Sequence, residues 1–218
     1  MSHFTVAVFT KTGTEEEVDR LLAPYQENNM GDCPKEYLTF VEDEDFDVDE
    51  ETGKRGYWEN PNAKWDWYQL GGRWPGLLVS AKGSGLRGTP SIFGGGRYKN
   101  DEYDCCLVAD IDFDAMEQRR RENLEPFETC FARRFFTPEY FNRLYPSEEA
   151  YIKAKTRFST YAVVTPDGAW HAKGKMGWWG MSSETPEEME QFRDEYKERF
   201  IQPAIEAGWY LTIVDCHI

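Results

Sequence analysis

The segment KWDWYQLGGRW, residues 64–74, gathers three indoles, a phenol, a carboxylate and a guanidinium. Aromatic faces stack on planar groups such as purines, and an arginine can hold a phosphate or a carboxylate through two hydrogen bonds. Consecutive glycines let the backbone approach a ligand closely. The segment therefore predicts a site for a nucleotide-type ligand, formed by Trp65, Asp66, Trp67, Tyr68, Gly71, Gly72, Arg73 and Trp74.

A structural interpretation of the same segment stays open. Trp65 and Trp67 would pack the surrounding region onto a sheet, and Asp66 would pair with Arg73 at the surface. The cluster matches no catalytic signature. Serine-hydrolase, Walker A, zinc-protease and kinase motifs do not occur in the chain, so no catalytic residue and no cofactor are predicted.

A second candidate is the acidic run EDEDFDVDEE at 42–51, which holds eight acids in ten positions. Such a block repels itself and should be solvated. Its alternating aspartates suggest a calcium loop, but Glu50 stands where that loop needs glycine. Dense carboxylates can also imitate a phosphate backbone and occupy a basic groove. We therefore expect a partner-binding surface formed by Glu42, Asp43, Glu44, Asp45, Asp47, Asp49, Glu50 and Glu51.

Two further tryptophans, Trp178 and Trp179, lie between glycines in the sequence GWWG. Indoles in a glycine-hinged turn are typical of an interface hot spot, and we count both as partner-binding candidates. Packing in the core is an equally good interpretation.

The histidines and the glycine-rich stretch give weaker signals. Zinc binds Cys and His, but adjacent strand residues point to opposite faces, so Cys216 and His217 cannot easily share an ion with His3, and no metal site is predicted. GSGLRG, residues 83–88, matches GxGxxG, yet Thr89-Pro90 follows instead of a helix. Together with Arg87 and Arg97 it could still form a lid with anion-binding amides.

The elements that must position these residues follow a recognisable order. Strands are expected at 4–9, on both sides of Pro166-Asp167-Gly168, and at 209–218, with helices after Thr14 and over 186–206. Without residues 26–158, this order is β-α-β-β-α-β, the split ferredoxin-like pattern. We predict an α+β single domain over 1–218: an antiparallel sheet core from 1–25 and 159–218, covered on one face by two helices. A large aromatic- and glycine-rich insertion, 26–158, would pack on the open face or an edge. The first and last strands would be adjacent, bringing His3 near Cys216-His217.

Composition limits the function classes. The 218 residues carry 25 Lys+Arg against 40 Asp+Glu, a net charge of −15. Such a charge argues against binding to nucleic acid or to anionic membranes. No apolar run is long enough for a transmembrane helix, and MSHFTVAVFT lacks the features of a signal peptide. Five cysteines without a CxxC pair indicate reduced thiols, with Cys105-Cys106 in a buried strand, so we expect a cytosolic protein.

Several blocks resemble a family of uncharacterised proteins common in bacteriophages and bacterial mobile elements. They are MSHFTV at 1–6, LAPYQEN at 22–28, NPNAKWDWYQLGGRW at 60–74 and DIDF at 110–113. The family has no settled activity, so the resemblance carries over no residue role. It implies a phage-type context, in which accessory proteins often counter host defences.

Together these observations predict a phage-type accessory protein in the host bacterial cytosol. It would be a non-catalytic, acidic protein that inhibits a basic nucleic-acid-binding host protein, such as a CRISPR effector. The alternative is a nucleotide-type small-molecule binding protein, a sponge or a hydrolase, that uses the WDWY–GGRW cluster. A third hypothesis is a scaffold of phage replication with no defence role. The sequence leaves the oligomeric state undetermined.

Overall fold

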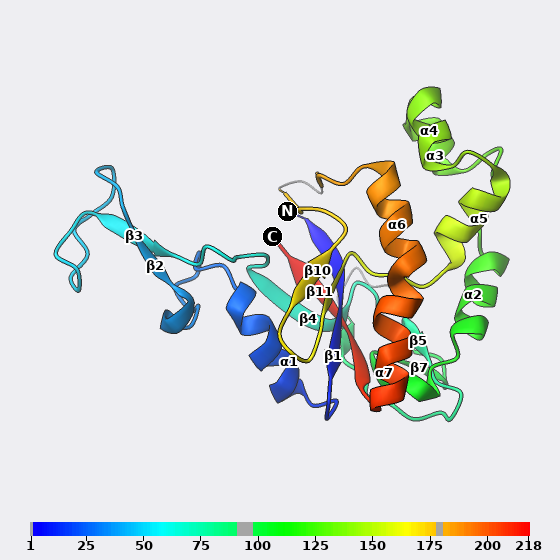
Figure 1. Ribbon diagram of the computed structural model, residues 1–218, viewed down its shortest axis with the longest axis horizontal. Coiled ribbons are helices and arrows are strands. Elements are labelled where there is room, and N and C mark those ends of the chain that lie inside the picture. Colours follow the sequence, from blue (N-terminus) through cyan, green and yellow to red (C-terminus); the bar gives the residue numbers. More distant parts are fainter. Residues whose placement is uncertain (1, 91–97, 178–180) are drawn as a thin grey trace.

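A computed structural model describes residues 2–90, 98–177 and 181–218 of the chain (Figure 1). The candidate residues Trp178 and Trp179, and Arg97 of the expected lid, lie outside the described residues.

The two longest strands lie side by side at the centre of the molecule. Strand β1 (His3–Thr10) and strand β11 (Tyr210–His217) are antiparallel, and His3 is paired with His217, as predicted. Both strands are rich in β-branched and aromatic residues, which suit a pleated, buried surface. The sheet runs in the order β10 (Trp170–Ala172), β9 (Ala162–Val164), β1, β11, β4 (Trp67–Gly72) and β6 (Thr89–Pro90), while β8 (Cys105–Leu107) also pairs with β11.

Helices cover both faces of this sheet (Figure 1). On one face, helix α1 (Glu15–Leu22) packs against Val6 and Val8 of β1. On the other face, helix α6 (Pro186–Tyr196), a π-helical turn (Lys197–Ile201) and helix α7 (Gln202–Ala207) pack against Ala7, Phe9 and the facing residues of β11. The result is a layered α/sheet/α arrangement around β1 and β11.

The structure confirms the α+β class but differs from a ferredoxin-like sheet in two respects. Strand β9, and not β10, lies beside β1 and is parallel to it, so the sheet is mixed instead of fully antiparallel. In addition, α1 and α6 cover opposite faces instead of sharing one. The physical reason lies in β1, where the continuous apolar run 6–9 presents buried side chains to both faces, and each face needs its own cover.

Residues 26–158 contribute to the sheet and also extend beyond it. They supply β4, β6 and β8, and they carry a projecting hairpin, β2 (Thr39–Glu42) and β3 (Gly56–Glu59), which we call the arm, residues 39–59 (Figure 1). A small two-stranded sheet joins β5 (Leu78–Val79) to β7 (Glu102–Tyr103). Single turns of 3-10 helix occur at Ala23–Tyr25, Lys35–Tyr37 and Val108–Asp110.

The end of this region is helical and has its own small core. Its helices are α2 (Phe113–Glu122), α3 (Phe131–Phe135), α4 (Pro138–Leu144) and α5 (Glu148–Thr156). Cys130, Phe141 and Tyr151 are buried together among them. Asp112, Thr137 and Ser147 cap three of these helices, each accepting a backbone N–H of the first turn.

Candidate functional site

His3, the first residue of β1, and His217, the last residue of β11, lie opposite each other at one end of the two central strands. Their ring centroids are 4.9 Å apart, with the rings inclined at 73°. Cys216 points to the opposite face and is buried among the residues that contact α1, as the alternation of a strand predicts. The third histidine, His171, lies on β10, where its Nδ1 is 3.1 Å from Nη2 of Arg199.

Each of the two imidazoles is held by a carboxylate. Nδ1 of His3 is 2.8 Å from Oδ1 of Asp215, and Nδ1 of His217 is 2.7 Å from Oδ1 of Asp66. A carboxylate on Nδ1 fixes the orientation of the ring. Proton exchange with a ligand would then fall to the two Nε2 atoms.

The WDWY–GGRW segment builds much of this arrangement. Asp66 supplies the carboxylate for His217, and its backbone N–H donates to the carbonyl of His217 at 2.9 Å. The Trp67 indole stacks on the His217 ring, with centroids 4.9 Å apart and planes inclined at 18°. It also meets the edge of His3 at 5.3 Å. Trp67 remains 44% exposed, so one aromatic surface beside the histidines stays open to a ligand.

Each glycine of the pair approaches a different carboxylate, Gly71 that of Asp104 and Gly72 that of Asp215. Gly72 has a φ of +51°, and a Cβ on it would lie 2.4 Å from Cβ of Asp215. This close approach lets the backbone N–H of Arg73 donate to Oδ2 of Asp215 at 2.9 Å. Asp215 is thus fully buried and bonded on both oxygens, one to Arg73 and the other to His3. The two glycines thus approach protein carboxylates, whereas the sequence suggested that they approach a ligand.

A second buried aspartate organises the neighbouring glycine loop. Asp104 accepts the N–H of Gly76 at 2.6 Å and the N–H of Gly88 at 2.7 Å, and it also accepts the Tyr98 hydroxyl. Burial, followed by the hydrogen bond to Asp104, raises the pKa of Tyr98. Arg87 donates to backbone carbonyls, including that of Lys99 at 2.8 Å. The described part of the expected anion-binding lid is therefore used in internal contacts.

The other residues of the segment divide between two faces of the sheet. Trp65 is buried against α1 and donates its Nε1–H to the carbonyl of Leu22 at 3.2 Å. Tyr68 meets Trp65 edge-on and donates its hydroxyl to Asp19. Trp74 packs against the core on the face of α6. The structural interpretation therefore holds for Trp65, whereas Asp66 contacts His217.

Burial shifts the pKa of two charged side chains near the turn that carries Asp66. Burial and then the neighbouring Asp66 raise the pKa of the Glu27 carboxyl. Burial and then Lys175 lower the pKa of Lys64. Both Glu27 and Lys64 flank the turn that carries Asp66: the Glu27 N–H donates to Trp65, and the Lys64 N–H donates to Tyr25.

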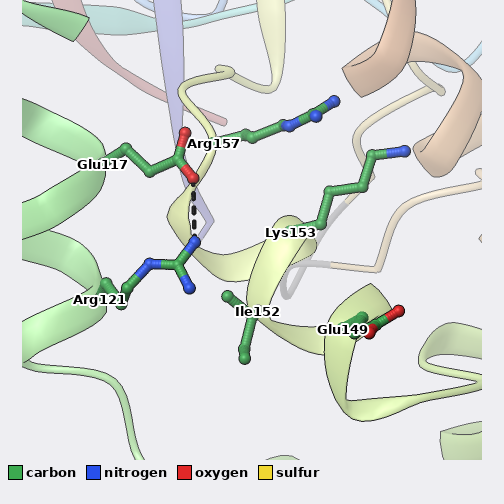
Figure 2. A pocket seen from close by; sticks show the side chains of 6 residues that line it. All are labelled: Glu117, Arg121, Glu149, Ile152, Lys153 and Arg157. Carbon is green, nitrogen blue, oxygen red and sulfur yellow. Dashed lines mark hydrogen bonds and ion pairs between the residues drawn. The ribbon is translucent and has the colours of Figure 1, made fainter. Parts of the chain in front are cut away.

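Two hollows lie outside this cluster. One, of about 380 Å³, follows β4 and β6 and includes Tyr68, Gln69 and Arg87 in its lining. The other, of about 240 Å³, lies between α2 and α5 (Figure 2). Its cations have acidic partners: Arg121 is 3.3 Å from Glu117, and Lys153 is 2.6 Å from Asp194. This pairing leaves little net positive charge to attract an anion.

The predicted partner-binding acids lie on the arm. Lys54 pairs with Glu42 and Lys35 pairs with Glu51, all at exposed positions. Asp49 shapes the turn of the hairpin, because its carboxylate accepts the backbone N–H of Thr52 at 2.8 Å. This hydrogen bond is the largest cause that lowers the pKa of the Asp49 carboxyl. Phe46 and Val48, between the acids, are 45% and 57% exposed.

Sequence reasoning missed Asp215 and Asp104. Asp215 is a single acid inside an apolar strand sequence, IVDC, and Asp104 directly precedes the apolar run CCLV. A carboxylate in such a run must be paired or hydrogen-bonded, so this pattern was the available signal. The cysteines, by contrast, are free and buried, as expected for reduced thiols.

In the part of the chain that the structure describes, no group of three or more His, Cys, Asp or Glu side chains is arranged to hold a metal ion. No helix there combines the length and the apolar character that crossing a bilayer requires. Comparison of the chain with protein-family models, with curated proteins and with solved structures found no match in any of the three.

Proposed function

We propose that the protein is a hydrolase that cleaves a small, nucleotide-type ester by general acid–base catalysis with His3 and His217. One observation carries this proposal: the two imidazoles lie 4.9 Å apart, and each is oriented by its own carboxylate. It extends the alternative of a ligand site at WDWY–GGRW, because that segment supplies Asp66, Trp67 and the Arg73 N–H to the same cluster.

The chemistry needs one imidazole as a base and one as an acid. The base takes a proton from water through its Nε2, and the oxygen of that water forms a bond to the phosphorus or carbonyl carbon of the ester. The bond to the leaving oxygen breaks, and that oxygen takes a proton from Nε2 of the second, protonated imidazole. The carboxylates of Asp66 and Asp215 hold the two rings in position through these steps. Proton exchange with water restores the starting state.

The surroundings limit the substrate to a small molecule. The side chains of His3 and His217 are only 10% and 6% exposed, so a bulky chain cannot reach both rings. The half-exposed indole of Trp67 offers a stacking surface for a planar base. The net charge of −15 disfavours a polyanion such as nucleic acid, whereas a single nucleotide experiences far less repulsion.

The test is turnover of nucleotides by the purified protein. A panel of cyclic nucleotides, nucleoside di- and triphosphates and dinucleotides is incubated with the wild type, His3→Gln, His217→Gln and the control His171→Gln. We expect each of the two site variants to lose about 100-fold or more in kcat, whereas His171→Gln keeps its rate. Turnover that survives both site substitutions in folded protein would overturn the proposal, as would a wild type that turns over no member of the panel.

We also propose a second, non-catalytic function, in which the arm binds a basic surface of a host protein and inhibits it. This proposal rests on the projection of the arm from the body (Figure 1) and on Phe46 and Val48, exposed among the acids. A nucleic-acid-binding defence protein such as a CRISPR effector has the required basic groove. This second proposal includes an origin in a bacteriophage and a location in the cytosol of the bacterial host.

Its test compares two triple charge reversals of equal net charge. One changes Asp43, Asp45 and Asp47 of the arm to Lys, and leaves Asp49 in place because it shapes the turn. The control changes Glu190, Glu198 and Glu206, which are exposed around α6 and α7, to Lys. We expect only the arm variant to lose inhibition of a purified CRISPR effector. Equal inhibition by both variants would contradict the proposal.

A further inference from the structure

An exposed aromatic pair lies on helix α3, in the helical region that carries the small core. Phe131 and Phe135 are 60% and 68% exposed, one turn apart. Their rings stack on each other, with centroids 5.4 Å apart and planes inclined at 21°. Two stacked phenyl rings in water are an unusual use of apolar surface, and exposed patches of this kind mark interaction sites.

The same short helix carries positive charge. Arg134 is exposed beside Phe135. Arg133 lies over the Phe141 ring, 4.4 Å from its centroid, which anchors α3 to the small core below. The carboxylate of Glu125 accepts the backbone N–H of Phe131 at 2.7 Å, at the start of this helix. The exposed residues of α3 are thus two phenylalanines and one arginine, and we call Phe131, Arg134 and Phe135 the α3 face.

The arm has the complementary character. The Phe46 ring packs against Tyr57, with ring centroids 4.5 Å apart and planes inclined at 36°, and Val48 is also exposed. Around them Asp43, Asp45 and Asp47 form no ion pair with a described residue. The arm thus combines apolar side chains with acids, and the α3 face combines phenyl rings with an arginine. The two surfaces are complementary in charge, and both offer apolar area for contact.

We propose that the α3 face docks the arm of a second copy of this chain. The arm and α3 lie at opposite ends of the molecule in Figure 1, so an arm is not expected to reach the α3 face of its own chain. The contact joins two different surfaces, and each bound pair keeps one free arm and one free α3 face. Such a heterologous contact continues into a ring or an open chain of copies. This proposal is independent of the acid–base site.

The experiment measures mass by sedimentation velocity, over a range of protein concentrations and at low and high salt. We expect the wild type to form dimers and larger species as concentration rises, and salt to weaken them because the contact is partly ionic. A wild type that stays monomeric at high concentration and low salt would overturn the proposal.

Two complementary variants test the head-to-tail geometry. Phe131→Ser with Phe135→Ser removes the α3 face and keeps the arm, whereas Asp45→Arg with Asp47→Arg reverses the arm and keeps the α3 face. Each variant alone should remain monomeric, and a mixture should form one-to-one dimers and nothing larger, because only one intact contact remains. Association of either variant alone, or a mixture that stays monomeric, would contradict the proposal. Circular dichroism checks that both variants are folded.

Discussion

The end of the central sheet and the arm both use carboxylates, but in opposite physical situations. At the sheet, Asp215 is fully buried and each of its oxygens accepts a hydrogen bond, from the Arg73 N–H and from His3. On the arm, acids such as Asp45 are exposed to water. The comparison teaches that the structural role of a carboxylate depends on how many hydrogen-bond donors surround it. The density of acids in the sequence does not show that number.

The largest expected effect comes from removing the buried carboxylate of Asp215. Asp215→Ala leaves the Arg73 N–H without its acceptor and His3 without its partner. Removing one member of a buried, bonded pair lowers the free energy of unfolding by about 3–5 kcal/mol. Asp45→Ala on the arm should change the free energy of unfolding by less than about 0.5 kcal/mol, because surface substitutions usually have small effects. Urea denaturation measures both, and equal losses would remove the distinction between the two regions.

The glycines give the next largest contrast. Gly53 in the arm and Gly72 at the sheet both have positive φ, +67° and +51°. A Cβ on Gly53 would meet nothing within 4 Å, whereas one on Gly72 would lie 2.4 Å from Asp215. Gly53→Ala should therefore cost about 1–2 kcal/mol for the backbone conformation alone. Gly72→Ala should cost about 1–3 kcal/mol more because of the overlap. Thermal unfolding of the two variants measures the difference.

A titration at high pH sharpens the comparison further. Burial raises the pKa of the Cys106 thiol from an ordinary value of 9.0 to about 12. The folded state thus binds this proton more tightly than the unfolded state. The resulting stability is fully present below about pH 9 and is lost as pH rises towards 12. One such group changes the free energy of unfolding by at most about 1.4 kcal/mol per pH unit.

Urea unfolding of wild type and Cys106→Ala between pH 8 and pH 10 measures that slope. The wild type should lose stability faster than Cys106→Ala over this range, whatever their difference at neutral pH. Parallel slopes would show that the thiol titrates in the folded protein as it does in the unfolded chain.

The smallest effect is local to the arm. Asp49 accepts backbone N–H groups of the turn and the Nε1–H of Trp58, and these bonds lower its pKa. Its contribution is present above its ordinary pKa and is lost as pH falls through the lowered value. Asp49→Ala should speed tryptic cleavage after Lys54 and Arg55 several-fold without changing global unfolding. Asp47→Ala is the matched control, and an unchanged cleavage rate in Asp49→Ala would show that these bonds do not order the hairpin.

Much of the framework follows from local sequence signals. The apolar run of β1, the Thr14 cap of α1 and the Pro166-Asp167-Gly168 turn predict their elements directly, because each depends on neighbours along the chain. The pairing of His3 with His217 also followed, once the first and last strands were placed side by side.

The strand order could not be obtained in this way. Whether β9 or β10 lies beside β1 depends on which faces of the sheet the helices cover and on where β4 adds to β11. The prediction of a ferredoxin-like order was wrong because it assumed one covered face, while the residues of β1 are buried on both.

The sequence by itself determined the residue types of this site: two terminal histidines, an aromatic segment with two glycines, and acids within apolar runs. Only the tertiary structure decided that the carboxylate of Asp66 contacts His217, and that the carboxylate of Asp215 contacts His3 and the Arg73 N–H. These pairs join residues far apart in the chain, and each forms because a buried donor or carboxylate must find a partner. Which partner lies within reach is set by strand register and by the close approach at Gly72, and neither is a property of any local segment.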